Sequence, residues 1–219
     1  MPTFPAPRQL PPRRLHWLAG ALLAVVLAGA VVLAATGNHP PFQPIDDWWY
    51  ATIHASRTAA LTAVNLALNF VGNWGMVLYC TALFAVLLRR HRFPALYVAA
   101  VNLGTLGLTH LIKFLLARPR PGDRLVSVDS GAFPSGHVSA TAAAVVCTAL
   151  LADRLWIWVS GSLLVVAMML SRAYLGAHWL SDTVAGAALG AGVALLLWGL
   201  LQDKCLQRHE SSPQLADRP

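Results

Sequence analysis

Charged residues are scarce in this sequence, and their scarcity excludes an ordinary water-soluble domain. Asp, Glu, Lys and Arg together make up 11% of the 219 residues, whereas an average soluble domain contains about 25%. Hydrophobic residues make up 57%, and the mean hydropathy is +0.57. One globular core is too small to bury so much apolar surface, and such a chain is neither disordered nor collagen-like. The composition therefore predicts that a lipid bilayer surrounds the protein.

Cysteine and acidic residues are also few. The three cysteines, Cys80, Cys147 and Cys205, cannot all pair and do not form a disulfide scaffold. The first two lie in apolar runs, where we expect them to act as packing residues. The chain contains no HExxH motif, no carboxylate cluster and no paired cysteines with metal-ligand spacing. We therefore predict neither a metal ion nor a cofactor.

Basic residues outnumber acidic residues by 16 to 9, which gives a net charge of +7. This balance is typical of proteins that bind nucleic acids, but here long uncharged runs separate the cations, so they form no single patch. Cations in such positions more often record membrane topology or bind anionic lipid and phosphate. The predicted partners are the bilayer and a lipid phosphate, with no nucleic acid, and the sequence gives no indication of the oligomeric state.

Uncharged apolar runs recur along the chain, and twenty residues in a helix span about 30 Å, the thickness of the hydrocarbon layer. We predict six spans, in residues 17–36, 58–88, 93–112, 138–152, 155–171 and 183–202. The sequence Gly72-Asn73-Trp74-Gly75 interrupts the second run. There we expect a short interfacial helix that leads into a span ending near Leu88, with a re-entrant pair as the alternative. The predicted fold class is an all-α membrane bundle of about six transmembrane helices, with the active site at its outer end.

The distribution of basic residues predicts the orientation of this bundle. Six spans place both termini on one side, together with Arg8, Arg13, Arg14, Arg89, Arg90, Arg92, Arg154, Lys204 and Arg208. By the positive-inside tendency this side is cytoplasmic, most simply in the cytoplasmic membrane. The prediction divides the chain into a cytoplasmic segment at 1–15, a six-span domain at 16–203 and a disordered cytoplasmic tail at 204–219. A cleaved signal peptide is the alternative for the first span.

Two further patterns concern packing. Pro40, Pro41 and Pro44 predict an extended linker, and the acidic and aromatic cluster at 46–50 that follows it suits the outer headgroup layer. The small-residue spacing of Gly186 and Gly190 in the last run predicts a close contact between helices.

The first cluster with chemical potential is KFLLARPRP, which contains Lys113 and Arg120. Pro119 and Pro121 disfavour helical backbone in the residues before them, so the helix should end near Arg118. Lys113 then stands in the last turns of a span and Arg120 in an extended exit, and both can face one anion. As an alternative, the arginines of this cluster could simply bind headgroups or snorkel to the interface.

Two further clusters lie on the same predicted side. In PSGH, Ser135 is a reasonable N-cap for the following helix, and Gly136 lets a ligand approach free N–H groups at a helix N-terminus, which attract phosphate. In SRAYLGAHWLSD, which begins at Ser171-Arg172, Asp182 follows His178 by four residues. If this stretch is helical, the carboxylate reaches the imidazole and leaves its other nitrogen free as a nucleophile.

Together the clusters supply two histidines, an orienting carboxylate, a lysine and two arginines, which is a set suited to phosphoryl transfer. Several fixed cations stabilise the transferred group, while one histidine attacks and the other protonates the departing oxygen. No divalent metal is needed for this arrangement. The three motifs resemble, in order and spacing, the signature motifs of the type-2 phosphatidic acid phosphatase superfamily of membrane lipid phosphatases. The resemblance runs from Lys113 to Asp182.

The resemblance implies a role for each matching residue. His178 would be the nucleophile that forms a phosphohistidine, and Asp182 would hold and polarise it. His137 would be the general acid for the leaving group and then the base for water. Phosphate oxygens would be bound by Lys113, Arg120 and Arg172, with the Ser135 hydroxyl and the Gly136 N–H. The family's usual independence from Mg²⁺ agrees with the lack of a carboxylate site.

Several alternatives remain open at the level of sequence. A lipid or anion transporter could reuse the basic site for binding, although transporters usually place ionisable groups near the bilayer midplane. A phosphotransferase would use the same base for an acceptor hydroxyl in place of water. The substrate is equally open, because undecaprenyl diphosphate, phosphatidylglycerol phosphate, phosphatidate and lipid A phosphates present the phosphoryl group at the same depth.

Overall fold

The computed structural model describes residues 11–89, 91–128 and 130–206, and within these ranges the chain is helical, with no β-strand. The predicted segment 1–15 and the predicted tail 204–219 fall mostly outside them. The elements are α1 (Pro12–Ala35), α2 (Gln43–Ala55), α3 (Ala59–Phe70), a π-helical turn η1 (Val71–Gly75), α4 (Met76–Leu88), α5 (Arg92–Leu116), α6 (Gly136–Ala152), α7 (Leu155–Tyr174) and α8 (Leu180–Leu206).

Five helical segments of the described chain are long and apolar enough to cross a bilayer. They are α1, the continuous segment Ala59–Leu88, α5, α7 and α8. The sixth apolar helix, α6, has only 17 residues and packs against α5, α7 and α8. Its buried face is rich in alanine, so α6 fits inside the bundle where longer side chains would not. The predicted all-α membrane bundle is confirmed.

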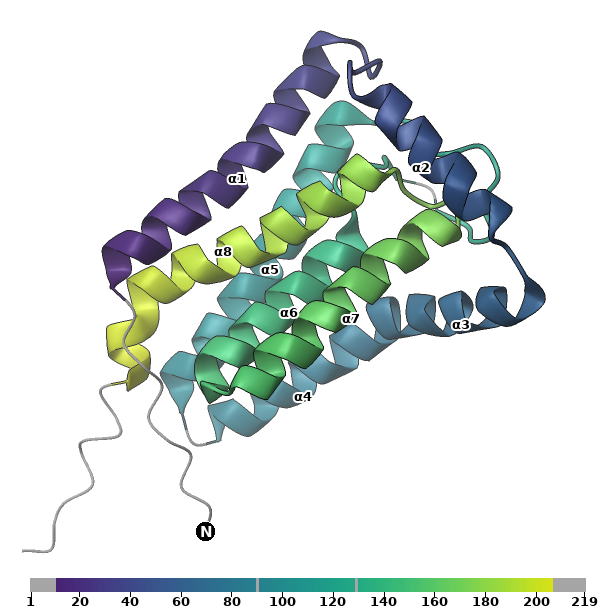
Figure 1. The fold of residues 1–219 in the computed structure, drawn as a ribbon. Helices are drawn as coiled ribbons and strands as arrows, with labels where there is room; N and C mark the ends of the chain where they lie inside the picture. The colour runs from purple at the N-terminus through teal and green to yellow at the C-terminus, as the bar shows by residue number, and fades with distance from the viewer. Residues whose placement is uncertain (1–10, 90, 129, 207–219) are drawn as a thin grey trace, which may run out of the picture.

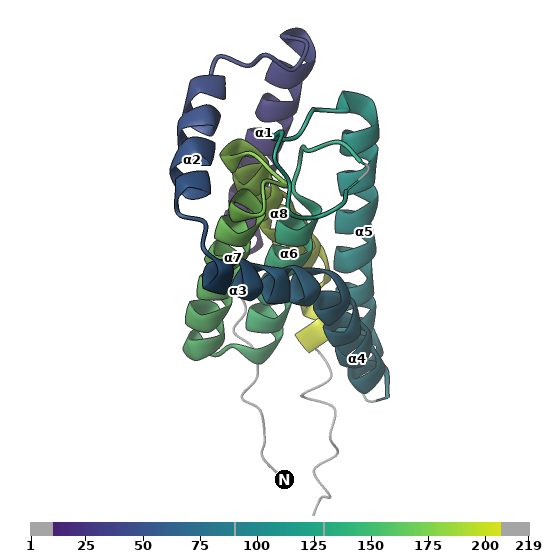
Figure 2. The same cartoon turned by 90° about the vertical axis from the view of Figure 1, so that its right-hand side faces the viewer.

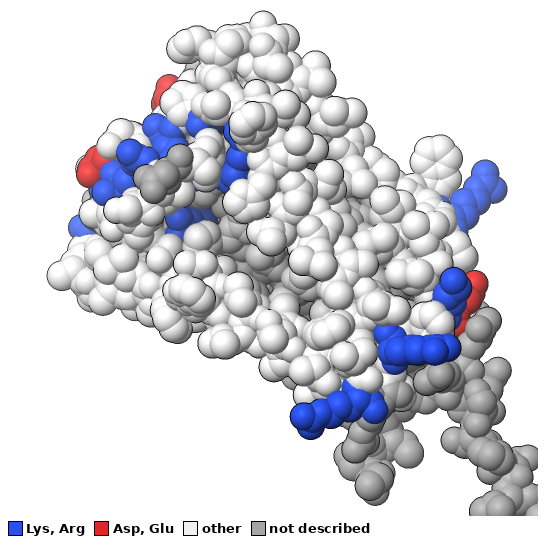
Figure 3. Space-filling model, turned by 180° about the vertical axis from the view of Figure 1, so that it is seen from behind, with Lys and Arg blue, Asp and Glu red and all other residues white. Residues whose placement is uncertain are grey.

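Both ends of the described chain lie at the same end of the bundle (Figures 1 and 2). The opposite end contains α2 and the long loop between α5 and α6. Figure 3 shows Lys and Arg side chains gathered at two ends of the molecule, with a broad uncharged belt between them. This is the distribution of a protein whose middle lies in hydrocarbon, since charged side chains there are costly.

The second apolar run forms one continuous helical segment, Ala59–Leu88, that bends at η1, and it does not form a re-entrant pair of helices. Phe70 and Met76, which flank η1, and Gly75, its last residue, all have right-handed helical backbone, and η1 joins α3 directly to α4. Figure 2 shows α3 lying across the direction of the bundle, whereas α4 runs along it. The expected interruption is therefore confirmed, and the chain does not adopt the re-entrant alternative.

The predicted proline linker is only partly extended. Pro44 lies in the first turn of α2, where a residue without an N–H loses no helical hydrogen bond, so the helix already begins at Gln43. The cluster at 46–50 is thus helical, and Asp46 is buried while Trp48 is exposed. One face of α2 therefore turns toward the protein.

The contact predicted at Gly186 and Gly190 is present between α8 and α6. A Cβ atom on Gly186 would lie 2.7 Å from the Ser135 carbonyl oxygen, and one on Gly190 would lie 2.1 Å from that of Ser139. Only hydrogen fits at these positions, so the two helices approach backbone to backbone. This contact fixes the beginning of α6, with Ser135 before it, against the first turns of α8.

Candidate active site

A cavity of about 500 Å³ lies between η1, α4, α5, α6 and the end of α7, and it reaches the loops at the end of the bundle away from the termini (Figure 1). Six of the eight residues predicted for the site line it: Lys113, Arg120, Gly136, His137, Arg172 and His178. The remaining two lie directly beside this set, because Ser135 precedes Gly136 and Asp182 contacts His178. Three motifs that are separated in the sequence therefore meet at one place.

Lys113 and Arg120 reach the cavity as the two prolines predict. Helix α5 ends at Leu116, and Ala117 has left-handed backbone with φ 44°, which turns the chain out of the helix. The Lys113 ammonium donates a hydrogen bond of 2.5 Å to the Gly131 carbonyl and lies 3.5 Å from that of Ala132. The loop between α5 and α6 thus holds the Lys113 ammonium in place through neutral carbonyl groups, which do not cancel its charge.

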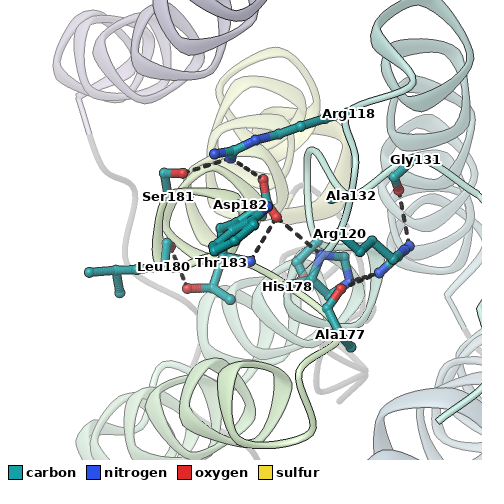
Figure 4. A network of polar contacts seen from close by, with 12 residues as sticks. Arg118, Arg120, Gly131, Ala132, Ala177, His178, Leu180, Ser181, Asp182 and Thr183 are labelled. Carbon is teal, nitrogen blue, oxygen red and sulfur yellow. Dashed lines mark hydrogen bonds and ion pairs between the residues drawn. The ribbon is translucent and has the colours of Figure 1, made fainter. Parts of the chain in front are cut away.

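The Arg120 guanidinium is held by carbonyl groups from two loops (Figure 4). Nε donates to Ser130 O at 2.9 Å, one terminal nitrogen donates to Gly131 O at 3.0 Å, and the other donates to Ala177 O. That last nitrogen also lies 3.1 Å from His178 Nε2. Because arginine has no acceptor, Nε2 must supply a lone pair, and the proton of a neutral His178 then sits on Nδ1.

His178 and Asp182 form the predicted pair, although through a turn and not within a helix. Helix α8 begins at Leu180, so His178 lies before it, and Nδ1 faces Asp182 Oδ2 at 3.6 Å. Oδ2 also accepts the Trp179 N–H at 2.9 Å, which is the capping interaction of an acidic residue in a first turn. The 3.6 Å between Asp182 Oδ2 and His178 Nδ1 is longer than a hydrogen bond.

The electrostatic setting keeps the His178 ring neutral. Burial, together with the charges of Arg120, Arg172 and Lys113, holds the pKa of His178 well below its ordinary value. Burial also lowers the pKa of the Arg120 guanidinium, while the charge of Asp182 opposes the shift. A neutral imidazole whose Nε2 carries no proton is the form that can attack phosphorus.

Ser135 and His137 present polar atoms with no protein partner among the described residues. Ser135 occupies the N-cap of α6 as predicted, but its hydroxyl does not cap the helix, and the residue is fully buried. Ser135 Oγ and His137 Nε2 are both buried without a hydrogen-bond partner in the described part of the chain. Buried polar atoms usually have partners, so this pair fits a site that a polar ligand completes.

Comparison with known proteins identifies the family. The model of the PAP2 superfamily matches residues 93–205, which is more than half of the chain. The chain belongs to the PAP2 superfamily.

Two relatives of this PAP2 chain are phosphatases by name. An undecaprenyl-diphosphatase of Sulfolobus acidocaldarius is 25% identical over 154 residues, covering 67% of this chain and 74% of the relative. A decaprenylphosphoryl-5-phosphoribose phosphatase of Mycobacterium tuberculosis is 36% identical over 118 residues, covering 52% of this chain and 64% of the relative.

Two solved structures share the fold of this PAP2 chain. The PAP2-type phosphatidylglycerolphosphate phosphatase of Bacillus subtilis superposes with a TM-score of 0.73 at 22% identity, covering 83% of this chain and 96% of that one. LpxE of Aquifex aeolicus superposes with a TM-score of 0.60 at 19% identity, covering 68% and 91%. At these identities the likeness concerns the fold alone.

Several residues outside the three PAP2 motifs also reach the site, and sequence analysis did not identify them. Asn69 at the end of α3 accepts a hydrogen bond from Arg172 through its side-chain oxygen. Gly72 in η1 packs against His137, and a Cβ there would lie 2.7 Å from His137 Cδ2. The interruption at 72–75 was visible in the sequence, and π-helical turns are frequent at functional sites. Nothing local indicated that this turn meets α6.

The structure decides between the two alternatives for Arg118 and corrects the headgroup-layer prediction for Asp46. Both side chains are buried, with exposed fractions of 1% and 2%, and they form an ion pair of 2.8 Å. Arg118 also pairs with Asp182 at 2.6 Å. A side chain so buried does not contact lipid headgroups, so the snorkelling alternative fails for Arg118.

Proposed function

We propose that this protein is an integral membrane phosphatase that hydrolyses a phosphate or diphosphate ester of a lipid through a phosphohistidine on His178, without a divalent metal. The supporting observation is the meeting of five potential phosphate ligands and acid–base groups, Lys113, Arg120, His137, Arg172 and His178, in one cavity. A transporter would have no evident use for a neutral imidazole backed by a buried carboxylate.

In the first step the phosphoryl group lies between His178 and His137. Lys113, Arg120 and Arg172 bind its equatorial oxygens, with the Ser135 hydroxyl and the Gly136 N–H at the beginning of α6. Nε2 of His178 attacks phosphorus, and the bond from phosphorus to the lipid oxygen breaks. His137, whose protonated form is favoured by the phosphate anion bound beside it, donates a proton to that oxygen, and Asp182 stabilises the positive charge that develops on His178.

In the second step water replaces the lipid alcohol. His137, now neutral, accepts a proton from water as the water oxygen attacks phosphorus, and the bond to Nε2 breaks. Inorganic phosphate leaves and both histidines return to their starting states. The three cations supply the charge that a metal ion provides in other phosphoryl-transfer enzymes.

The cavity favours an amphiphilic substrate. Below the polar groups its lining is largely apolar and comes from the membrane helices α4 and α5, with residues such as Val77, Leu103 and Leu106. A lipid tail can occupy this part while the phosphate remains at the end of the bundle. By their names, both sequence relatives described above act on polyprenyl-linked phosphates, so we place this class first among the substrates.

Purified protein in detergent tests the proposal with the four lipid classes named above. We expect phosphate release in EDTA, with inorganic phosphate and not a phosphorylated second lipid as the product. His178→Ala should lose at least about four orders of magnitude in kcat and form no labelled phosphoenzyme. His137→Ala should be most impaired with poor leaving groups. His39→Ala, which changes an exposed histidine, is the matched control.

Two results would contradict the proposal. Activity that EDTA removes and Mg²⁺ restores would argue against catalysis by the three cations. Full turnover by His178→Ala would exclude the nucleophile. A phosphorylated acceptor lipid in place of free phosphate would instead assign the same site to a transferase.

A further inference from the structure

Beside the catalytic cavity, three buried charged side chains form two consecutive ion pairs that link α2 to the beginning of α8. The side chains of Arg118, Asp46 and Asp182 have exposed fractions of 1%, 2% and 0%. Charges removed from water are costly unless they are paired with good geometry. Neither Arg118 nor Asp46 is among the described residues that line the cavity, so phosphate binding does not account for them.

The two ends of Arg118 hold two different carboxylates. One terminal nitrogen donates to Asp182 Oδ1 at 2.6 Å and to Ser181 Oγ at 2.8 Å (Figure 4). The other donates to Asp46 Oδ2 at 2.8 Å and to the side-chain oxygen of Gln43 at 3.0 Å. A planar guanidinium held at both ends has little freedom to rotate.

This arrangement fixes the direction of the Asp182 carboxylate. Arg118 binds Oδ1, while the Trp179 N–H binds Oδ2 at 2.9 Å. With a donor on each oxygen the carboxylate cannot turn, and Oδ2 stays opposite His178 Nδ1. That direction favours the tautomer of His178 that is protonated on Nδ1 and not on Nε2, and Arg120 favours the same tautomer from the other side of the ring.

Asp46, on α2, is the carboxylate of this network that lies farthest from His178, and it also binds Ser181. Its Oδ1 accepts the Ser181 N–H at 2.8 Å, and its Oδ2 accepts the Ser181 hydroxyl at 2.6 Å. The Ser181 N–H is one of the free donors in the first turn of α8, so Asp46 caps that helix from α2. The carboxylate therefore ties α2, Arg118 and the beginning of α8 together.

We propose that Arg118 and Asp46 are positioning residues for the reaction: Arg118 orients Asp182 toward His178, and Asp46 holds Arg118 in place. The inference rests on the proposed function, because it requires His178 to be the nucleophile. Neither residue touches the phosphate, so their loss should affect the rate of phosphoryl transfer and leave substrate binding unchanged.

The test compares Arg118→Met, Arg118→Lys, Asp46→Asn and the double variant Asp46→Asn/Arg118→Met. Arg124→Met changes an exposed arginine in the same loop, and Asp47→Asn changes the exposed neighbour of Asp46, so both serve as matched controls. For each protein we would measure kcat, KM and the rate of phosphoenzyme formation, normalised to the folded fraction. The tautomer of His178 would be followed by NMR of ¹⁵N-labelled histidine, assigned with His178→Gln.

We expect Arg118→Met to lose about 10- to 100-fold in kcat and in phosphoenzyme formation, as is typical when an orienting partner is removed. KM should be unchanged, and the share of Nε2-protonated His178 should rise. Arg118→Lys should recover part of the rate, because a point charge can still reach Asp182. Asp46→Asn should lower kcat less than Arg118→Met does. The double variant should have the same kcat as Arg118→Met alone, because the two residues act as one unit.

Other outcomes would show whether the positioning role or the proposed function itself is wrong. Wild-type kcat and tautomer in folded Arg118 variants, or additive losses in the double variant, would overturn the positioning role while His178→Ala remained inactive. Activity in His178→Ala would overturn the proposed function itself. If Arg118→Met does not fold, Arg118→Lys and Asp46→Asn decide the question, because both retain most of the packing volume.

Discussion

At the scale of single residues, Arg120 shows that the shape of a cation matters as well as its charge. Its three nitrogens bind carbonyl groups of Ser130, Gly131 and Ala177, and one of them also contacts the proposed nucleophile. A lysine keeps the charge but offers a single flexible donor group, which cannot reach these carbonyls, His178 and a phosphate oxygen together.

We therefore predict that Arg120→Lys loses roughly 100-fold in kcat/KM, the scale observed when one donor to a developing anion is removed. Phosphate release from the best lipid substrate measures this. Arg124→Lys makes the same change at an exposed position of the same loop and should behave like wild type. Equal effects of the two substitutions would show that only the general positive charge of the loop matters.

At the scale of elements, the π-helical turn η1 connects the second membrane segment to the proposed general acid. Gly72 packs so closely against α6 and α7 that a Cβ would lie 2.7 Å from His137 Cδ2 and 2.7 Å from Met168 Cε. The methionine side chain is flexible and can move. The imidazole is held by the beginning of α6, so its displacement changes the geometry of proton transfer.

Gly72→Ala should therefore reduce kcat by about 10-fold or more, because small displacements of catalytic groups are costly, and overpacking should cost about 1–3 kcal/mol of stability. Gly75→Ala is a matched control in the same turn, since its Cβ would meet Val71 at an ordinary 3.5 Å. Steady-state kinetics and thermal unfolding in detergent measure both effects. A Gly72→Ala protein with wild-type kcat would show that η1 does not position His137.

Sequence patterns were sufficient for elements whose signal is local. Six apolar runs predicted six apolar helical segments, of which five are long enough to span a bilayer and α6 is shorter; two prolines predicted the end of α5, and Gly186 and Gly190 predicted a close helix contact. The roles of Asp46, Asn69 and Arg118 could not be predicted in this way. Asp46 and Arg118 are 72 positions apart, and no periodicity connects residues at such a separation. A buried arginine and an interfacial arginine also look identical in a sequence.

At the scale of the whole molecule, the structure accounts for most of the basic residues on the side that the sequence predicts to face outward. Both termini of the described chain lie at the end opposite the cavity (Figure 1), as an even number of spans requires. The end with the cavity also contains several cations, namely Arg57, Lys113, Arg118, Arg120, Arg124 and Arg172. Taken alone, these cations weaken the argument from basic residues.

Most of these cations have partners or a site to occupy. Arg57 pairs with Asp123 at 2.7 Å and Arg118 pairs with two buried carboxylates. Lys113, Arg120 and Arg172 line the cavity. The basic residues that remain free to act as topological signals are mainly at the other end, near the beginning of α1, the turn between α4 and α5, the turn before α7 and the end of α8. These contacts agree with the prediction from the sequence that the end with the termini is cytoplasmic and the cavity faces outward, which stays a prediction.

Cysteine labelling in intact cells tests this orientation. In a variant without Cys80, Cys147 and Cys205, a single cysteine is introduced at Ser127 in the loop beside the cavity, or at Lys204 in the last turn of α8, both of which are exposed. A membrane-impermeant maleimide should label Ser127→Cys in intact cells, and Lys204→Cys only after permeabilisation. The opposite pattern would place the site in the cytoplasm, and the lipid phosphates of the inner leaflet would then be the substrates to test.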